Sequence, residues 1–167
     1  MTITAPQTSA PPSVSLQPTG WLRYLSFSVD HKVIGLQYLV CGFAFYLIGG
    51  AMAGAIRTEL LSPVSDFMPR DVYNQILTLH GTVMIFLWIV PVVNGAFGNY
   101  LIPFYVGARD MAYPRLNAVA FWLIPPAGLM LISSYFITGA AQSGWTAYPP
   151  LSITTPAAGQ IIWILSV

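Results

Sequence analysis

Three long stretches without Lys, Arg, Asp or Glu divide the chain and predict three membrane-crossing helices. They run from Ile34 to Ile56, from Val72 to Ala108 and from Leu116 to Ile137. Each holds the roughly 20 residues that a helix needs to cross about 30 Å of bilayer hydrocarbon. A helix over the second stretch would be about 55 Å long and would cross with length to spare.

The segments outside these stretches are shorter or more polar. Thr138 to Pro156 is a polar loop that contains glycine and proline, and it is followed by the apolar stretch Ala157 to Val167. That last stretch is too short to cross a bilayer, so it predicts the start of a fourth helix. We therefore expect an all-α, multi-pass membrane protein with three full spans and a fourth begun, the N-terminal piece of a longer chain.

The first 29 residues differ from the rest. Met1 to Gly20 is rich in Thr, Ser and Pro and has no charged residue, which predicts a disordered tail. Trp21 to Phe27 mixes large apolar side chains with Arg23 and is expected to lie along the membrane interface. We divide the chain into this tail and interfacial segment, 1–29, and a membrane domain, 30–167.

Glycine recurs every seven residues in the first span, at Gly35, Gly42 and Gly49. This spacing places the three glycines on one face of a helix. Small residues let membrane helices approach closely, so we expect another helix to pack against this face.

Composition supports a membrane class. Hydrophobic residues make up 56% of the chain and charged residues 7%, whereas about a quarter of the residues in soluble domains are charged. Six basic and five acidic residues leave no charge excess for nucleic-acid binding. The single cysteine, Cys41, excludes an intrachain disulfide.

Basic residues indicate the orientation. Four of the six precede the first span or lie between the second and third, and two lie on the opposite side: Arg23, Lys32, Arg109 and Arg115 against Arg57 and Arg70. The opposite side also carries Glu59, Asp66 and Asp71. The positive-inside rule then predicts a cytoplasmic N-terminus.

His80 lies inside the second span, and an ionisable residue within a membrane helix suggests function. One interpretation is a haem ligand, with Arg57 reaching a similar depth from the first helix and pairing with polar groups of the macrocycle. The other is an interhelical hydrogen bond from His80, with Arg57 as a residue that ends the span. His31 is roughly 20 Å away at the opposite membrane face, so it cannot be a second axial ligand.

A second polar group is expected at the cytoplasmic side. Asp110 follows the second span, Asn99 lies near the end of that span, and Asn117 begins the third. A carboxylate at a channel mouth can collect protons, and the two carboxamides can order water above it. A solvated loop is the simpler alternative.

Five segments in order resemble the opening quarter of subunit I of haem-copper oxidases: DHKVIGLQYL, IRTEL, YNQILTLHGTVMIF, FGNYLIPFYVGARDMAYPRLNAVAFWLIPP and GWTAYPPLS. Together they cover nearly everything from Asp30 to Ser152. The resemblance implies a twelve-helix subunit I and a bacterial member, with the protein in the cell membrane.

The resemblance also implies roles for the residues around His80. The histidine of TLHGT would be an axial ligand of the low-spin haem, expected to be haem A, and Arg57 would lie against that haem. Trp145 and Tyr148 of GWTAYPPL would lie beside its propionates. Ligands for the second haem face, the high-spin haem and copper are expected elsewhere in the full subunit.

Asp110, Asn99 and Asn117 match the entrance of the family's D-type proton pathway. Ala118 and Ala120 stand where many members have Asn and Ser, so the polarity above that entrance is in question.

Positions that bind quinone in the quinol-oxidising branch match Ile48, Met52 and Val72, with Gln75 retained. Apolar side chains cannot hydrogen-bond a quinone carbonyl, so cytochrome c or another small soluble donor is the expected electron donor. Glu59 matches an outer cation site in some members, and a surface carboxylate is the equal alternative.

The complete enzyme is expected to transfer electrons from cytochrome c through the low-spin haem to a haem-copper centre that reduces O2 to water, with proton pumping. Its partners would be the remaining helices of subunit I, subunits II and III, and lipid. These 167 residues alone are not expected to be active. A small helical transporter and a non-catalytic truncated subunit remain alternatives.

Overall fold

A computed structural model describes residues 20–64, 67–137, 139–154 and 157–167 of the chain. Within these ranges all regular secondary structure is helical. The predicted disordered tail lies outside the described residues except for Gly20. The all-α class predicted from the charge-free stretches is confirmed.

Three helices are long and apolar enough to cross a membrane: His31–Glu59, Arg70–Val106 and Pro114–Ile137. The elements in order are η1 (Gly20–Leu25), α1 (His31–Glu59), α2 (Arg70–Thr82), η2 (Val83–Ile89), η3 (Pro91–Phe97), α3 (Gly98–Val106), α4 (Pro114–Ile137), α5 (Leu151–Thr154) and α6 (Ala157–Ser166). The second span therefore contains α2, η2, η3 and α3.

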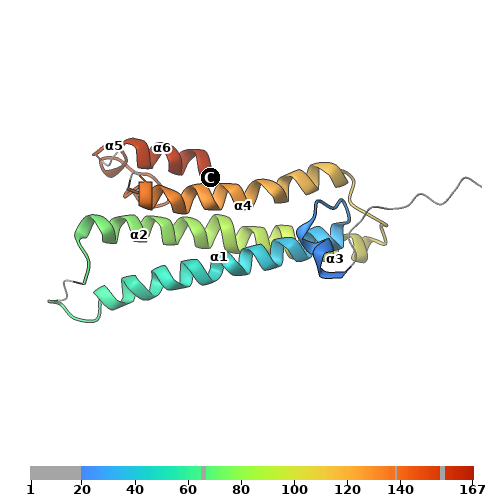
Figure 1. The fold of residues 1–167 in the computed structure, drawn as a ribbon, viewed down its shortest axis with the longest axis horizontal. Helices are drawn as coiled ribbons and strands as arrows, with labels where there is room; N and C mark the ends of the chain where they lie inside the picture. The colour runs from blue at the N-terminus through green and yellow to red at the C-terminus, as the bar shows by residue number, and fades with distance from the viewer. Residues whose placement is uncertain (1–19, 65–66, 138, 155–156) are drawn as a thin grey trace, which may run out of the picture.

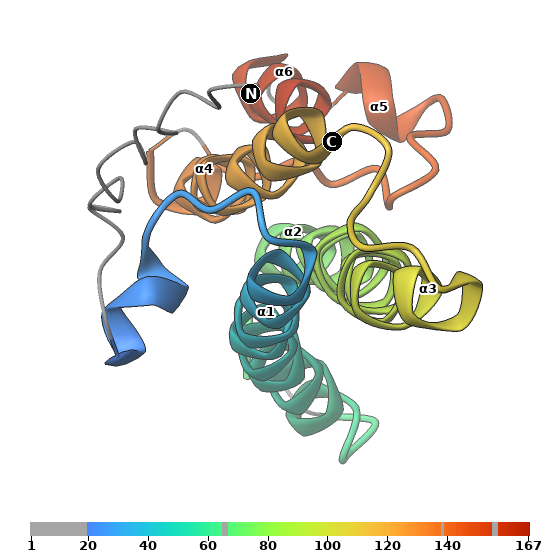
Figure 2. The same cartoon turned by 90° about the vertical axis from the view of Figure 1, so that its right-hand side faces the viewer.

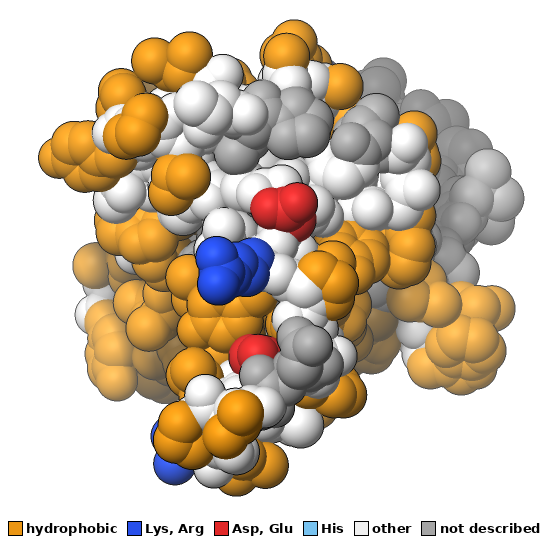
Figure 3. Space-filling model, turned by 90° about the vertical axis from the view of Figure 1, so that its left-hand side faces the viewer, with side chains coloured by type: hydrophobic (Ala, Val, Ile, Leu, Met, Phe, Trp, Pro, Cys, Tyr) orange, Lys and Arg blue, Asp and Glu red, His pale blue; other side chains and the backbone are white. Residues whose placement is uncertain are grey.

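The spans run up and down side by side (Figure 1). The end of α1, the start of α2, α5 and the start of α6 lie at one end of the bundle, and η1, α3 and the start of α4 lie at the other. Seen along the bundle, α1 and α2 are neighbours, and α6 stacks on α4 (Figure 2). Figure 3 looks onto the end with α5 and shows few charged side chains among hydrophobic ones.

Helix α1 extends the predicted span by about one turn at each end. At its start the Asp30 side chain accepts a hydrogen bond from the backbone N–H of Lys32 at 2.9 Å. This N-cap satisfies an amide that has no partner within the helix, so the helix can begin at His31.

The second span contains two π-helical segments, η2 and η3, that its sequence pattern did not predict. Pro91 begins η3, and proline cannot donate the backbone hydrogen bond of a regular helix. The span ends at Gly107, whose φ of 69° is left-handed, a conformation that favours glycine at a helix C-terminus.

The glycine face of α1 packs against the second span, as its spacing predicted. A Cβ at Gly35 would lie 3.0 Å from the Ala96 carbonyl oxygen, and one at Gly42 would lie 2.7 Å from Val92 Cγ2. A Cβ at Gly49 would lie 2.6 Å from Met84 Sδ. Larger side chains would force the two helices apart.

The expected interfacial segment forms a 3-10 helix, η1, with Trp21 and Leu25 exposed. The buried Gln37 side chain donates hydrogen bonds to the carbonyl oxygens of Tyr24 and Ser26 at 3.0 and 2.9 Å. These bonds fix the segment to the first turns of α1.

Replacing Gly42 by Ala is expected to destabilise the bundle by about 1–3 kcal/mol, the usual cost of overpacking, because the new methyl group meets a stiff β-branched side chain. The measurement is the temperature at which the detergent-extracted protein loses its helical circular dichroism. Gly50→Ala is the control, because a Cβ there meets nothing within 4 Å. An equal melting temperature for the two variants would contradict the close approach at Gly42.

Candidate functional site

The two histidines of the chain lie at opposite ends of the bundle, each in a different polar environment. His80 lies in α2, and His31 begins α1.

The imidazole of His80 is held by the backbone of α1. Its Nδ1 lies 2.9 Å from the carbonyl oxygen of Gly49. A carbonyl oxygen only accepts hydrogen bonds, so in the neutral imidazole Nδ1 carries the proton and Nε2 keeps its lone pair. Among the described residues Nε2 has no hydrogen-bond partner. This is the tautomer and the second contact typical of a histidine that ligates a metal.

The backbone of Arg57 lies further along α1 than the residue that contacts His80. His80 lies beside Gly49, and Arg57 is eight residues further along α1, about 12 Å at the helical rise. The register of the two helices sets this offset, because α1 extends beyond Ile56 and α2 begins at Arg70. Arg57 is exposed and forms no ion pair within the described part of the chain. It can therefore contact the edge of a large group at His80 but not the imidazole.

Trp145 reaches the helical turn of His80. A Cβ at Gly81 would lie 3.4 Å from Trp145 Cδ1, and the Trp145 ring meets that of Phe86 edge to face at 6.2 Å. Since Gly81 follows His80 directly, the indole lies beside the histidine in space although it is far away in sequence. Tyr148 is 73% exposed and lies in the same loop, with no side-chain contact to this group among the interactions of the described residues.

Two buried threonines of α2 were missed by the sequence analysis. Thr78 Oγ1 accepts a hydrogen bond from the backbone N–H of Gly144 at 2.9 Å, and Thr82 Oγ1 accepts one from Trp163 Nε1 at 2.8 Å. Both hydroxyls also donate to carbonyl oxygens one turn earlier in α2. They attach the loop that carries Trp145, and helix α6, to the turns on either side of His80. Threonine at a spacing of four beside a histidine is too common a pattern to have predicted this.

At the opposite end, His31 and Asp110 form a pair that the sequence analysis did not predict. His31 Nδ1 lies 3.1 Å from Asp110 Oδ1, with the histidine side chain 7% exposed and the aspartate 41% exposed. The same carboxylate accepts the backbone N–H of Met111 at 2.7 Å. A buried imidazole therefore lies directly behind a solvent-facing carboxylate.

The two asparagines predicted to act together are in contact. Asn117 Nδ2 donates to Asn99 Oδ1 at 2.6 Å, and Asn99 Nδ2 donates to the Gly95 carbonyl oxygen. Asn99 is eight residues before Gly107 and so lies roughly 12 Å deeper than the loop of Asp110.

Ala118 and Ala120 lie in different environments. Ala118 is fully buried in an apolar cluster with Ile34, Tyr38 and Phe121, whereas Ala120 is exposed on α4. The cluster therefore has no polar side chain at the Ala118 position.

The side chains at the positions that match the family's quinone site do not gather into a polar cluster. Ile48 and Met52 line an apolar cavity of about 370 Å³ between α1, α2 and α4. Gln75 is engaged elsewhere, since its Oε1 accepts the backbone N–H of Ala140 at 3.2 Å.

Glu59 closes the connection after α1. Its Oε2 accepts the backbone N–H of Met68 at 3.0 Å. In the described ranges no three His, Cys, Asp or Glu side chains gather as a metal site would require.

The comparisons with known proteins identify the family. Residues 33–167 match the profile of the family described as "Cytochrome C and Quinol oxidase polypeptide I". The chain belongs to this family. With three helices able to cross a bilayer, this oxidase polypeptide is an integral membrane protein.

Relatives of the oxidase polypeptide share long alignments with this chain. It is 61% identical over 147 residues to a protein named cytochrome c oxidase subunit 1 from Thermostichus vulcanus, covering 88% of this chain and 26% of that protein. The protein of the same name from Synechocystis sp. is 62% identical over 146 residues, 87% of this chain and 26% of the relative. One from Corynebacterium efficiens is 41% identical over 160 residues, 90% of this chain and 27% of the relative. The chain thus spans about a quarter of the length of these relatives.

Thr78→Val is expected to loosen the Trp145 loop, because the variant keeps the side-chain shape but leaves the Gly144 N–H without an acceptor. Losing such a buried bond costs about 1–3 kcal/mol. Hydrogen exchange measured by mass spectrometry should be faster around Gly144, by roughly tenfold or more. Thr58→Val is the control, since the exposed Thr58 hydroxyl donates only to Gly54 in its own helix. Unchanged exchange in Thr78→Val would contradict the role given to this hydroxyl.

Proposed function

We propose that this chain is the N-terminal part of the catalytic subunit of a bacterial cytochrome c oxidase. In the complete complex, electrons from cytochrome c would pass through a low-spin haem to a haem-copper centre where O2 is reduced to water, and protons would be pumped. The observation that carries the proposal is the His80 imidazole, fixed through Nδ1 on Gly49 with Nε2 left to ligate iron.

The residues around His80 suit a haem. The Gly49 carbonyl fixes the ring tautomer and increases the basicity of Nε2, which favours iron ligation. When bound, the haem would supply one-electron transfer, for which we propose haem A. The second axial ligand, the ligands of the high-spin haem and the copper ligands would come from the remaining helices of the subunit.

The loop and helix-end residues would contact the edge of that haem. Arg57, two turns outward from His80, would pair with a polar substituent, and the indole N–H of Trp145 could donate to a propionate. We assign Tyr148 to the same edge on the family resemblance. We assign Glu59 to an outer cation site on the family resemblance alone, because its carboxylate already accepts the backbone N–H of Met68.

The cytoplasmic cluster would collect protons. We propose that the exposed Asp110 carboxylate takes protons from solvent and that Asn99 and Asn117 order water above it, in a D-type pathway. Two contacts support the proposal: the His31 imidazole on Asp110, which can exchange a proton with it, and the hydrogen bond between the asparagines. Because Ala118 is buried in an apolar cluster, we predict that the water molecules of the pathway pass around this cluster.

Cytochrome c is the proposed donor in place of a quinol. The cavity beside Ile48 and Met52 is apolar, and Gln75 is used to hold the backbone of Ala140. A quinone carbonyl would find no donor there, and an unpaired buried carbonyl is costly. The names of the relatives agree with this choice.

The proposed setting is the bacterial cell membrane, with the N-terminus and the Asp110 loop in the cytoplasm. The distribution of basic residues supports this orientation. Within the complex the partners would be the other helices of subunit I, subunits II and III, and lipid.

His80→Ala is expected to remove the low-spin haem band from the reduced-minus-oxidised visible spectrum of the purified complex, because the iron loses a protein ligand. His31→Ala is the matched control, since it removes the chain's other histidine at the opposite end, and the band should remain. A band that survives in His80→Ala would contradict the ligand assignment. Absence of any haem in the wild-type complex would contradict the oxidase proposal.

Asp110→Asn is expected to slow oxygen consumption by on the order of a hundredfold, the usual effect of removing a positioned proton-transfer group. The haem spectrum should be unchanged, because the substitution is far from His80. Asp71→Asn at the other end of the bundle is the control for removing an exposed carboxylate. Equal oxygen-consumption rates for the two variants would contradict proton uptake at Asp110.

A further inference from the structure

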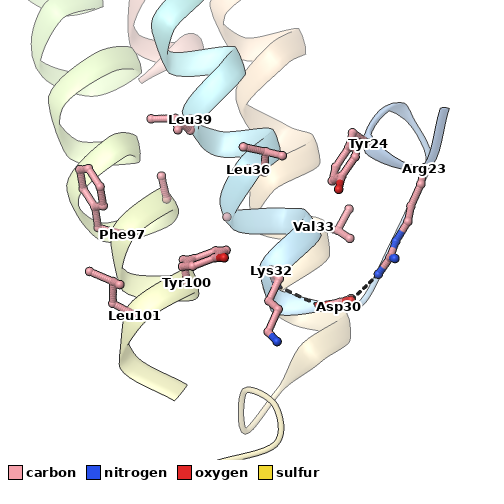
Figure 4. Close-up of a pocket in the computed structure, with 12 residues that line it drawn as sticks. Arg23, Tyr24, Asp30, Lys32, Val33, Leu36, Leu39, Phe97, Tyr100 and Leu101 are labelled. Carbon is pink, nitrogen blue, oxygen red and sulfur yellow. Dashed lines mark hydrogen bonds and ion pairs between the residues drawn. The ribbon is translucent and has the colours of Figure 1, made fainter. Parts of the chain in front are cut away.

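A groove at the cytoplasmic end of the bundle has a charged mouth and apolar walls. Its cavity of about 630 Å³ lies between η1, α1 and the end of the second span. That volume is within the range of small-molecule sites in proteins. Figure 4 shows Lys32 and the Asp30–Arg23 pair at one end of the groove, with Leu36 and Leu39 following along α1.

The mouth carries one uncompensated positive charge. Arg23 Nη2 pairs with Asp30 Oδ2 at 2.6 Å, and Asp30 Oδ1 caps the backbone of Lys32. The Lys32 side chain is exposed and has no ion pair among the described residues. One free ammonium beside a neutralised pair matches a headgroup with a single net negative charge.

The apolar walls of the groove extend from the charged mouth toward the membrane interior, as the acyl chain of a lipid does. Leu36 and Leu39 lie about 6 and 10 Å deeper than Lys32 at the helical rise. Phe97 and Leu101 line the same groove from the second span (Figure 4). Tyr100 lines the groove between Leu36 and Lys32, and Tyr24 lies level with Leu36 (Figure 4). Tyrosine is typical of the headgroup level of membranes.

We propose that this groove is a binding site for one anionic phospholipid of the phosphatidylglycerol type. Its phosphate pairs with Lys32 beside Arg23, and one acyl chain lies between Leu36 and Leu39 on one side and Phe97 and Leu101 on the other. The η1 segment, held on α1 by Gln37, forms the outer wall beside the upper part of the acyl chain. The site is separate from the haem site, and its mouth residues Arg23, Asp30 and Lys32 also line the neighbouring pocket that contains His31 and Asp110.

The test is native mass spectrometry of the complete complex, extracted from nanodiscs of equal phosphatidylglycerol and phosphatidylethanolamine. The wild type should retain one phosphatidylglycerol. Lys32→Gln should reduce the preference over phosphatidylethanolamine by about fivefold, the factor that one basic residue contributes at an anionic surface. Leu39→Trp should abolish retention of both lipids by filling the groove.

Two controls match these variants. Arg115→Gln removes a basic residue of the same membrane face that lines a different pocket, and Val40→Trp adds an indole at an exposed neighbour outside the groove. Both should retain the lipid as the wild type does. The haem spectrum of every variant should match that of the wild type, which separates this test from that of the proposed function.

Three outcomes would overturn the proposal. The lipid preference could be the same in Lys32→Gln and Arg115→Gln. Free glycerol phosphate could displace the lipid completely, which would make the site one for the headgroup anion alone. A density map of the complex could show a protein segment filling the groove.

Discussion

The hydrogen bond from His80 to the Gly49 carbonyl depends on how closely α1 and the second span approach. Gly49 belongs to the face that also contains Gly35 and Gly42, and a Cβ at any of the three would press on the facing helix. A side chain at Gly49 would meet Met84, one turn beyond His80, and widen the gap at the level of the imidazole. The glycine spacing of α1 thus fixes both the packing of the bundle and the tautomer of the histidine.

The same two helices place the two candidate sites, around His80 and around Asp110, at different depths. At one end, α2 presents His80 while the loop after α4 brings Trp145 to the neighbouring turn. At the other end, the first residue of α1, His31, meets Asp110 after the second span. Between these ends lie two apolar clusters, one with Ala118 and Ile34 toward the His31 end and one with Leu87 and Leu131. The proposed electron transfer and the proposed proton uptake would then take place toward opposite ends of one packed unit.

The sequence predicted the spans and the packed face of α1, because both follow from patterns within one segment. It did not predict contacts that depend on how far one helix is shifted along another. The charge-free stretches predicted all three spans, and the seven-residue spacing predicted the packed face of α1. The backbone of Arg57 lies about two turns beyond the level of His80, an offset that depends on where each antiparallel helix begins. The bond from Gly144 to Thr78 and the contact of His31 with Asp110 join residues far apart in sequence. The roles of Tyr148 and Glu59 came from family resemblance and remain predictions.

The central claim is that the Gly49 carbonyl holds His80 so that Nε2 ligates a haem. A cryo-electron microscopy map of the complete complex, at a resolution that distinguishes the two ring nitrogens by their contacts, tests it most directly. The account predicts haem iron at Nε2 of His80, with Nδ1 still on the Gly49 carbonyl oxygen. A haem ligated by other residues, or a His80 ring turned so that Nδ1 faces the iron, would contradict it.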